Sequence, residues 1–150
     1  MLRLSKKADY ALMAVRHLAC RAGSPSTSAR EIAEQYDIPL ELMAKVLQRL
    51  VRAGLLVSTQ GTRGGYALSR SSALISVADV IQAIDGPFTV TACSSENSDC
   101  EQYSKCSIRD SLWQIRERIA ATLGTVTMAE MAAGDDAAHA PFAHAAVIRR

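Results

Sequence analysis

The chain has 150 residues, 49% hydrophobic and 21% charged, which is close to the composition of an average globular protein and excludes a wholly disordered chain. No apolar run approaches the ~18 residues needed to span a bilayer, and residues 1–7 lack a signal-peptide pattern, so we expect a cytoplasmic protein. Residues 1–91 hold 11 Lys/Arg against 7 Asp/Glu, and residues 92–150 hold 6 against 8, a mildly basic first part that is compatible with an anionic partner.

Capping signals and the helical spacing of apolar residues predict three helices in the first part of the chain. Ser5 can cap the first helix, which a stretch of glycine, serine and proline breaks. Ser28 and Glu31 have the spacing of a capping box, which opens a short second helix. A tight turn at residues 37–39 leads into the third helix, which Gly54 ends.

Two short apolar runs, at residues 55–58 and 66–68, flank a glycine-rich connection at residues 60–65. This pattern predicts a β-hairpin. Three helices followed by a hairpin is the order of a winged helix-turn-helix, in which the third helix lies in the major groove and the hairpin forms the wing. We therefore predict a mainly α fold with a small β-hairpin wing and assign residues 1–70 to a DNA-binding domain.

Candidate DNA contacts lie on the outer face of the third helix and at the hairpin tip. Gln and Lys suit base edges or phosphates, and Glu can accept from a cytosine amino group. Thr and Arg beside glycines suit a phosphate or the minor groove. The candidates are Glu41, Lys45, Gln48 and Arg49 on the helix, and Gln60, Thr62, Arg63 and Gly64 at the tip. The alternative is a solvated face on a helical domain that contacts other proteins.

After the hairpin, residues 71–133 are expected to hold a Ser76-capped helix, an irregular loop at residues 92–106 and a long helix that begins at Ile108 and ends at Gly124. A capping box at residues 127–130 opens a last short helix. The alanine-rich tail, residues 134–150, is predicted to be disordered.

Three of the four cysteines, Cys93, Cys100 and Cys106, fall in the irregular loop as C-x6-C-x5-C. Structural disulfides are disfavoured in a reducing compartment, so metal or redox chemistry gains weight. The spacing suits a flexible three-thiolate collar better than a zinc knuckle, whose ligands come in closer pairs. Soft thiolates select iron–sulfur clusters, zinc or copper(I), and free thiols are the alternative. Cys20, among apolar residues, is predicted to be in the core.

Several stretches carry a resemblance to a known family: LRLSK (2–6) with DYA (9–11), RGGYAL (63–68), ISVADVI (75–81), the three-cysteine loop and VTMAEM (126–131). Together, over about residues 1–133, they resemble the Rrf family of iron–sulfur-sensing winged-helix regulators, which includes IscR and NsrR. The resemblance implies a homodimer formed through the long helix, and a cluster whose state alters the affinity for operator DNA. It implies that Cys93, Cys100 and Cys106 ligate this cluster. Residues 106–109 and 113–114 look most like the branch that regulates iron–sulfur assembly operons of the Suf type.

One position departs from the family pattern. Regulators of the IscR kind use a histidine three residues after the last cysteine, where this chain has Arg109. A guanidinium has no lone pair to donate, so it cannot replace that ligand, but it can offset thiolate charge nearby. Regulators of the NsrR kind use an aspartate donated by the partner subunit, and Asp9 stands at the matching position. The resemblance makes Asp9 the candidate fourth ligand, with Glu96, Glu101 or an exogenous group as alternatives, and it favours a 4Fe–4S over a 2Fe–2S cluster.

The leading hypothesis is therefore a homodimeric repressor that binds a double-stranded DNA operator and controls iron–sulfur assembly or redox and nitric-oxide stress genes. One alternative is a regulator without a cluster whose cysteines form a thiol switch. Another is a zinc-stabilised interaction module that does not bind DNA. No glycine-rich phosphate loop, nucleophile elbow or recognisable pair of catalytic His and carboxylate is present in the sequence, which argues against an enzyme.

Overall fold

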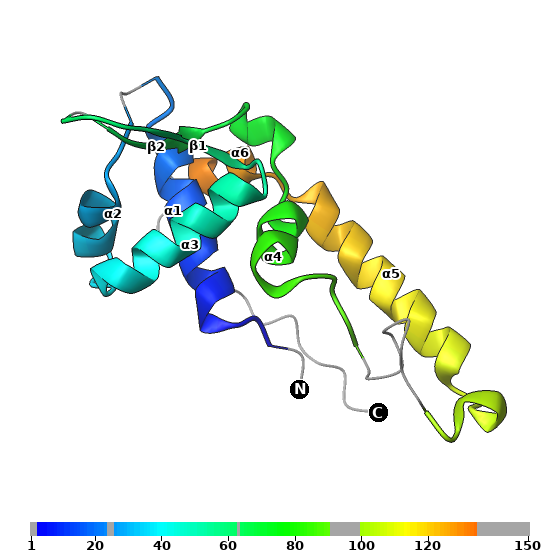
Figure 1. Ribbon diagram of the computed structural model, residues 1–150. Helices are drawn as coiled ribbons and strands as arrows, with labels where there is room; N and C mark the ends of the chain where they lie inside the picture. Colours follow the sequence, from blue (N-terminus) through cyan, green and yellow to red (C-terminus); the bar gives the residue numbers. More distant parts are fainter. Residues whose placement is uncertain (1–2, 24–25, 63, 91–99, 135–150) are drawn as a thin grey trace.

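The structure is a computed structural model that describes residues 3–23, 26–62, 64–90 and 100–134. Its elements in chain order are α1 (Lys6–Cys20), α2 (Ala29–Gln35), α3 (Leu40–Arg52), β1 (Leu56–Thr59), β2 (Gly65–Leu68), η1 (Ser72–Leu74), α4 (Val77–Asp85), η3 (Tyr103–Lys105), α5 (Arg109–Thr125) and α6 (Met128–Ala133). In Figure 1 the hairpin and the other helices form one body, from which α5 projects. The predicted mainly helical fold with a β-hairpin wing is confirmed.

Helices α1, α2, α4 and α6 begin where the sequence places capping side chains, whereas α3 and α5 begin without a side-chain cap. Ser5 Oγ accepts a hydrogen bond of 3.1 Å from the first turn of α1. Ser28 and Glu31 form the predicted capping box at the start of α2, with bonds of 3.2 and 2.9 Å. The predicted cap at Ser76 is formed as a full capping box with Asp79, and the box predicted at residues 127–130 is also formed. Because each cap satisfies amide groups that the helix itself leaves unpaired, these local signals fix where the helices start.

The core is one cluster built around α1. Buried side chains of α3 and α4 pack against α1, and Met128 of α6 packs there too. The buried residues of α3 and α4 recur every three or four positions, so each helix has one apolar side. The largest fully buried side chains are Val15, Ile32, Met43, Val46, Leu47, Leu50, Leu56, Ile75, Val80 and Met128. Since α3 is buried along one side only, its opposite side faces solvent.

The wing is an antiparallel pair in which Leu56 lies opposite Leu68 and Thr59 opposite Gly65. A backbone bridge joins the wing to the segment before α2. The Thr27 amide donates to the Tyr66 carbonyl oxygen (3.0 Å), and the Tyr66 amide donates to the Thr27 carbonyl oxygen (2.8 Å). The two backbones come so close that a Cβ on Gly65 would lie 2.6 Å from the Thr27 carbonyl oxygen. Glycine at this position is therefore required by the contact between the wing and the body.

Two sequence predictions are wrong. The long helix does not end at Gly124 but continues to Thr125 and gives way to extended backbone at Val126, because Gly124 does not adopt the positive φ with which Gly54 (φ 75°) follows α3. Cys20 is not in the core: it is the exposed last residue of α1, with Sγ 4.0 Å from the carbonyl oxygen of Ala132. Helical periodicity places a residue on a face, but the neighbouring element decides whether that face is covered.

Within the described ranges, no helix is long and apolar enough to cross a membrane. The predictions for the tail at residues 135–150 lie outside the described residues.

Candidate DNA-contacting surface and thiolate loop

The outer face of α3 presents the predicted polar residues to solvent. Glu41, Lys45, Gln48 and Arg49 are all exposed, while Met43, Val46, Leu47 and Leu50 on the opposite side are buried. Packing of the apolar side holds α3 against the body, so the polar side is free to meet a second macromolecule. A major groove is wide enough to admit one α-helix, and this face is the one that would enter it.

The helix-turn-helix is closed by a short turn between α2 and α3. Asp37 has a positive φ of 51° there, and the Ile38 amide donates 2.9 Å to Ala33. Aspartate tolerates this left-handed backbone better than most side chains do. The turn therefore fixes the angle at which α3 crosses α2.

The wing tip carries the other predicted contacts. Gln60 and Thr62 are exposed and Gly64 is half-buried, while Arg63 lies outside the described residues. A Cβ on Gly64 would collide with the carbonyl oxygen of Thr59. The tip is thus a tight turn in which glycine is required, with polar side chains on its surface.

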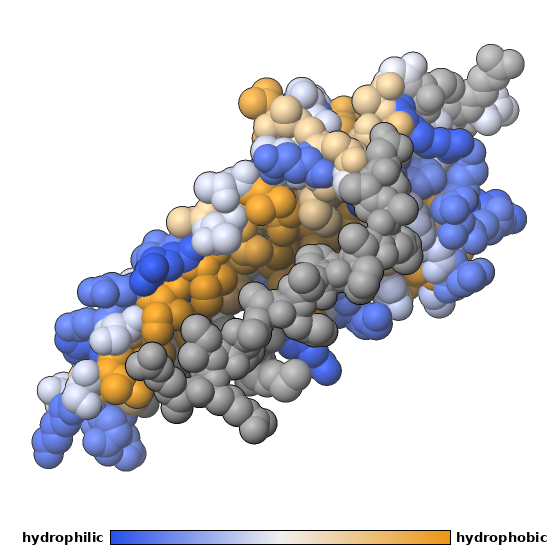
Figure 2. Space-filling view, turned by 180° about the vertical axis from the view of Figure 1, so that it is seen from behind, coloured by the Kyte–Doolittle hydropathy of each residue, from blue (hydrophilic) through white to orange (hydrophobic). Residues whose placement is uncertain are grey.

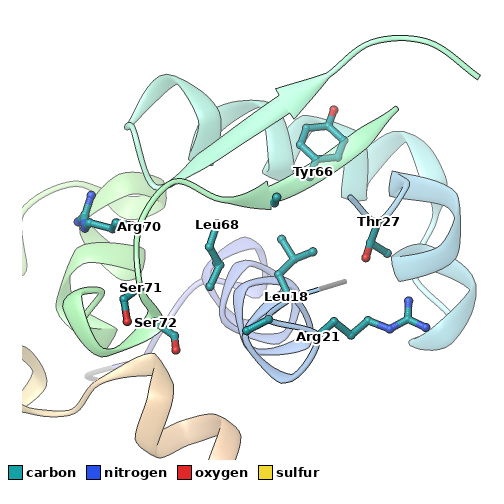
Figure 3. Close-up of a pocket in the computed structure, with 11 residues that line it drawn as sticks. Leu18, Arg21, Thr27, Tyr66, Leu68, Arg70, Ser71 and Ser72 are labelled. Carbon is teal, nitrogen blue, oxygen red and sulfur yellow. The ribbon is translucent and has the colours of Figure 1, made fainter. Parts of the chain in front are cut away.

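Arg70 anchors the base of the wing. Its Nε donates to the Leu74 carbonyl (3.0 Å), Nη1 to the Gly54 carbonyl (3.4 Å), and Nη2 lies 3.8 Å from Asp79. The cavity beside it, shown in Figure 3, has Leu18 of α1 facing Leu68 of β2, with Ser71 and Ser72 on one side and Arg21 and Thr27 on the other. Arg70, which the sequence did not single out, therefore holds β2 to the end of α3 and to α4.

His17 joins α1 to the end of α2. Its Nδ1 lies 3.3 Å from the Tyr36 hydroxyl, and the two rings meet edge to face at 5.7 Å. Its Nε2 is buried and has no hydrogen-bond partner among the residues that the structure describes. Burial, followed by the positive charge of Arg21, lowers the pKa of His17, so the neutral ring is the form that suits this contact.

Cys100 and Cys106 flank the single turn η3 at the outer end of α5 (Figure 1). Both are half-buried free thiols. The turn is closed by the Tyr103 amide, which donates 2.9 Å to the Cys100 carbonyl, and by the Lys105 amide, which donates 3.0 Å to Gln102. Cys93 lies outside the described residues. The structure therefore places two of the three predicted thiolate ligands at either end of one compact turn.

Arg109, in the first turn of α5, folds back onto this turn. Its Nη1 donates 3.2 Å to the Tyr103 carbonyl, and its guanidinium carbon lies 4.6 Å from the centre of the Tyr103 ring. Its Nε donates 2.9 Å to Asp110. The hydrogen bond and charge of Asp110 raise the pKa of Arg109, with smaller contributions from Tyr103 and Cys106.

Asp9 is not brought to the thiols within one chain. It lies in the first turn of α1, partly exposed, 3.9 Å from the Lys6 ammonium. In the part of the chain that the structure describes, no three His, Cys, Asp or Glu side chains lie close enough together to hold a metal ion. Of the alternative carboxylates, Glu101 is exposed beside Cys100, and Glu96 lies outside the described residues.

The projecting helix α5 has no buried residue. Ile108, Trp113 and Ile115 are 59%, 39% and 45% exposed, and Arg116 stacks 4.3 Å from the Trp113 ring. Figure 2 shows an apolar band that follows the projecting part of the molecule. Ile108 and Ile115 are seven residues apart and therefore lie on the same side of the helix, and large exposed apolar patches are typical of interaction surfaces.

Comparison with known proteins agrees with this architecture. A family model described as "Rrf2: Iron-dependent Transcriptional regulator" matches residues 4–134. The HTH-type transcriptional regulator IscR of Yersinia pseudotuberculosis is 30% identical over 136 residues, which cover 90% of this chain and 82% of the relative.

Among solved structures, CymR, the global cysteine regulator of B. subtilis, is 28% identical with a TM-score of 0.73, over 89% of this chain and 98% of CymR. T. potens IscR is 27% identical with a TM-score of 0.72, over 92% and 91%. The relatives are named as transcriptional regulators, so the family resemblance stated from the sequence is confirmed. They also agree with the prediction that the protein is not an enzyme. The chain belongs to the Rrf2 family of winged-helix transcriptional regulators and is not an enzyme.

Proposed function

We propose that the protein is a homodimeric repressor whose affinity for operator DNA depends on an iron–sulfur cluster ligated by Cys93, Cys100 and Cys106. The observation that carries this proposal is the pair of half-buried free thiols, Cys100 and Cys106, at the two ends of one hydrogen-bonded turn. The turn keeps the two cysteines in one short segment of backbone, so both could offer soft thiolate ligands. Such ligands favour iron–sulfur clusters over hard cations.

The donor set of the described residues fits this group, although it is incomplete in one chain. Cys100 and Cys106 are thiols rather than partners in a disulfide, and Cys93 would add the third thiolate. Asp9, contributed by the partner subunit, is our candidate fourth ligand, and its oxygen favours a 4Fe–4S over a 2Fe–2S cluster by analogy with the NsrR kind. When bound, the cluster would supply a centre sensitive to iron supply, oxidants and nitric oxide.

The shape of α5 supports ligation across a dimer. Its 17 residues correspond to about 25 Å of helix, and the thiol-bearing turn lies at the end that points away from the body (Figure 1). Ile108, Leu112, Ile115 and Ile119 recur every three or four residues and therefore share one side of α5, where Ile108 and Ile115 are exposed and would provide an apolar face for a second α5. Packing two such helices side by side would carry each thiol turn toward the other subunit, where a residue such as Asp9 could complete the ligand set.

The DNA contacts are assigned to α3 and the wing. We place Gln48 and Glu41 at base edges, and Lys45 and Arg49 at phosphates or base edges, in the major groove. Gln60, Thr62, Arg63 and Gly64 would contact the backbone or the minor groove at the wing tip. A dimer would present its two α3 helices to half-sites about 34 Å apart.

The link between thiols and DNA is geometric. Ligation of the three thiolates would shift α5 or the partner's α1, and both shifts would change the distance between the two α3 helices. Because half-site spacing on DNA is fixed, a small rotation of one subunit against the other changes affinity.

The test begins with protein purified without oxygen. We expect a brown sample with a broad band near ~400 nm, and Mössbauer doublets would give the cluster type. Operator affinity is then compared between the iron-loaded protein, the apo protein and a variant with Cys93, Cys100 and Cys106 changed to Ala. Cys20→Ala is the matched control, because Cys20 is an exposed cysteine outside the loop. Equal affinity in all forms would refute cluster sensing, and normal iron content in Asp9→Ala would exclude Asp9 as a ligand.

A thiol switch is the second candidate. It is favoured by the similarity to CymR, whose structure in an oxidised form from S. aureus is 26% identical with a TM-score of 0.67, and by the closeness in sequence of Cys100 and Cys106. Here peroxide would oxidise two loop thiols to a disulfide and would itself be reduced to water. A colourless protein whose DNA affinity changes on peroxide treatment and returns with a reductant would support this candidate over the cluster.

A further inference from the structure

Arg109 makes contacts that a free surface arginine does not make. One nitrogen of its guanidinium donates to the backbone carbonyl of Tyr103, and the face of the same group covers the Tyr103 ring. A second nitrogen is held by Asp110, which belongs to the same helix turn. The guanidinium is therefore fixed on the α5 side by Asp110 and attached to the turn by two different parts of Tyr103.

Tyr103 is in turn hydrogen-bonded to Cys100, one of the proposed thiolate ligands. Its amide donates 2.9 Å to the carbonyl of Cys100, so a continuous chain of contacts runs from Asp110 through Arg109 and Tyr103 to Cys100. Cys106 lies between Tyr103 and Arg109 in sequence, three residues before Arg109. The contacts therefore tie the backbone of Cys100 to the first turn of α5 across the segment that holds Cys106.

We propose that Arg109 is a positioning residue that forms the Cys100–Cys106 half of the thiolate site before any metal binds. Arg109 would hold the turn through its contacts with the Tyr103 carbonyl and the Tyr103 ring. The histidine that regulators of the IscR kind have at this position would instead act by binding the metal. This inference rests on the proposed function for its biological role, but the contacts themselves are properties of the metal-free protein.

The residue type suits this task. The guanidinium is planar, so it can stack on a ring and donate in its own plane at the same time. The ammonium of a lysine keeps the charge but has neither the fork nor the flat face. Exchanging Arg109 for Lys therefore separates a positioning role from a purely electrostatic one.

The experiment measures hydrogen exchange at the Tyr103 amide in reduced apo protein. We compare the unmodified chain with Arg109→Lys, Arg109→Gln and Tyr103→Leu, which removes the ring. The matched controls are Tyr103→Phe, which keeps the ring, and Arg118→Lys at an exposed position of α5.

The expected result is that Arg109→Lys, Arg109→Gln and Tyr103→Leu each speed exchange of this amide by about fivefold or more, the factor that corresponds to one ordinary hydrogen bond. Both controls should match the unmodified chain. An amide that exchanges at the unprotected rate in the unmodified chain, or protection that survives in Arg109→Lys, would overturn the proposal.

A second readout is the rate at which iron is lost from the loaded protein in air, followed by the fading of its visible absorption. We expect faster loss in Arg109→Lys and Arg109→Gln than in Arg118→Lys. The two readouts separate the hypotheses. If no form of the protein binds iron, the proposed function fails while hydrogen exchange still decides the role of Arg109. If iron binds normally and exchange is unaffected, Arg109 has no positioning role and the proposed function stands.

Discussion

Replacing Gly65 by alanine should detach the wing from the body. The added Cβ would lie 2.6 Å from the Thr27 carbonyl oxygen, 2.7 Å from its carbon and 3.0 Å from the Ser28 amide nitrogen. All three are backbone atoms, so no side chain can rotate away to make room. Either β2 or the segment before α2 must move, and the Thr27–Tyr66 bridge of 3.0 and 2.8 Å is the contact that breaks.

The size of the effect follows from the two hydrogen bonds that break and the methyl group that is added. Two hydrogen bonds contribute about 0.5–1.5 kcal/mol each, and forcing an extra methyl group into a packed site costs about 1–3 kcal/mol. We expect a decrease of about 2–6 kcal/mol in the free energy of unfolding. With a urea dependence of about 2 kcal/mol per molar, the midpoint should fall by roughly 1–3 M.

The assay is urea unfolding followed by circular dichroism, with operator binding measured in parallel, since a displaced wing would lose the DNA contacts that we propose for its tip. Gly134→Ala is the matched control, because the nearest atom to its added Cβ is 3.8 Å away and its φ of −68° suits alanine. The control should stay within about 0.5 kcal/mol of the unmodified protein. A Gly65→Ala variant with the same midpoint as Gly134→Ala would refute the reasoning.

Three further outcomes are expected. Lys45→Ala should weaken binding to all DNA sequences alike and reduce the slope of log affinity against log salt by about 0.9, whereas an unchanged slope would mean that Lys45 contacts no phosphate. Ile115→Asp, at a position 45% exposed on α5, should shift the protein toward monomer in sedimentation, and Gln114→Asp on the same helix is the control; dimers of equal stability would remove α5 from the interface. Burial lowers the pKa of His17 in the folded state, so the unfolded chain binds the proton more readily and stability falls as pH drops below about 6.5. His17→Gln should lose less stability between pH 7.5 and 5.5 than the unmodified protein does, and identical pH profiles would contradict the assignment.

Cys100, Cys106 and Arg109 show which features of the site the sequence predicts and which depend on the tertiary structure. The sequence by itself predicts a loop with three cysteines, because spacing and polarity are visible in order along the chain. It excludes Arg109 as a ligand, since a guanidinium has no free lone pair. In the structure, Arg109 instead covers the Tyr103 ring and donates to the Tyr103 carbonyl. These contacts form because the backbone changes direction between the two residues, and the spacing of residues along the sequence does not predict that change of direction.

The same division holds for the fold. Ser5, Ser28, Ser76 and Thr127 mark helix starts in sequence and in structure, because a cap acts on amides within three residues of itself. The buried side of α3 and its polar outer face also follow from a repeat that is local to one helix. Local chemistry therefore determined the elements, their order and the candidate recognition surface.

What the tertiary structure decided are the contacts between segments far apart in the chain. Cys20 has apolar neighbours in sequence but is exposed at the end of α1, where its Sγ lies 4.0 Å from the carbonyl oxygen of Ala132 in α6. The sequence predicts Gly65 only as a hairpin glycine, yet the residue is required by the approach of Thr27, 38 residues earlier. Burial and close approach depend on which surfaces meet in three dimensions, and that is set by the packing of the whole core rather than by any stretch of residues within it.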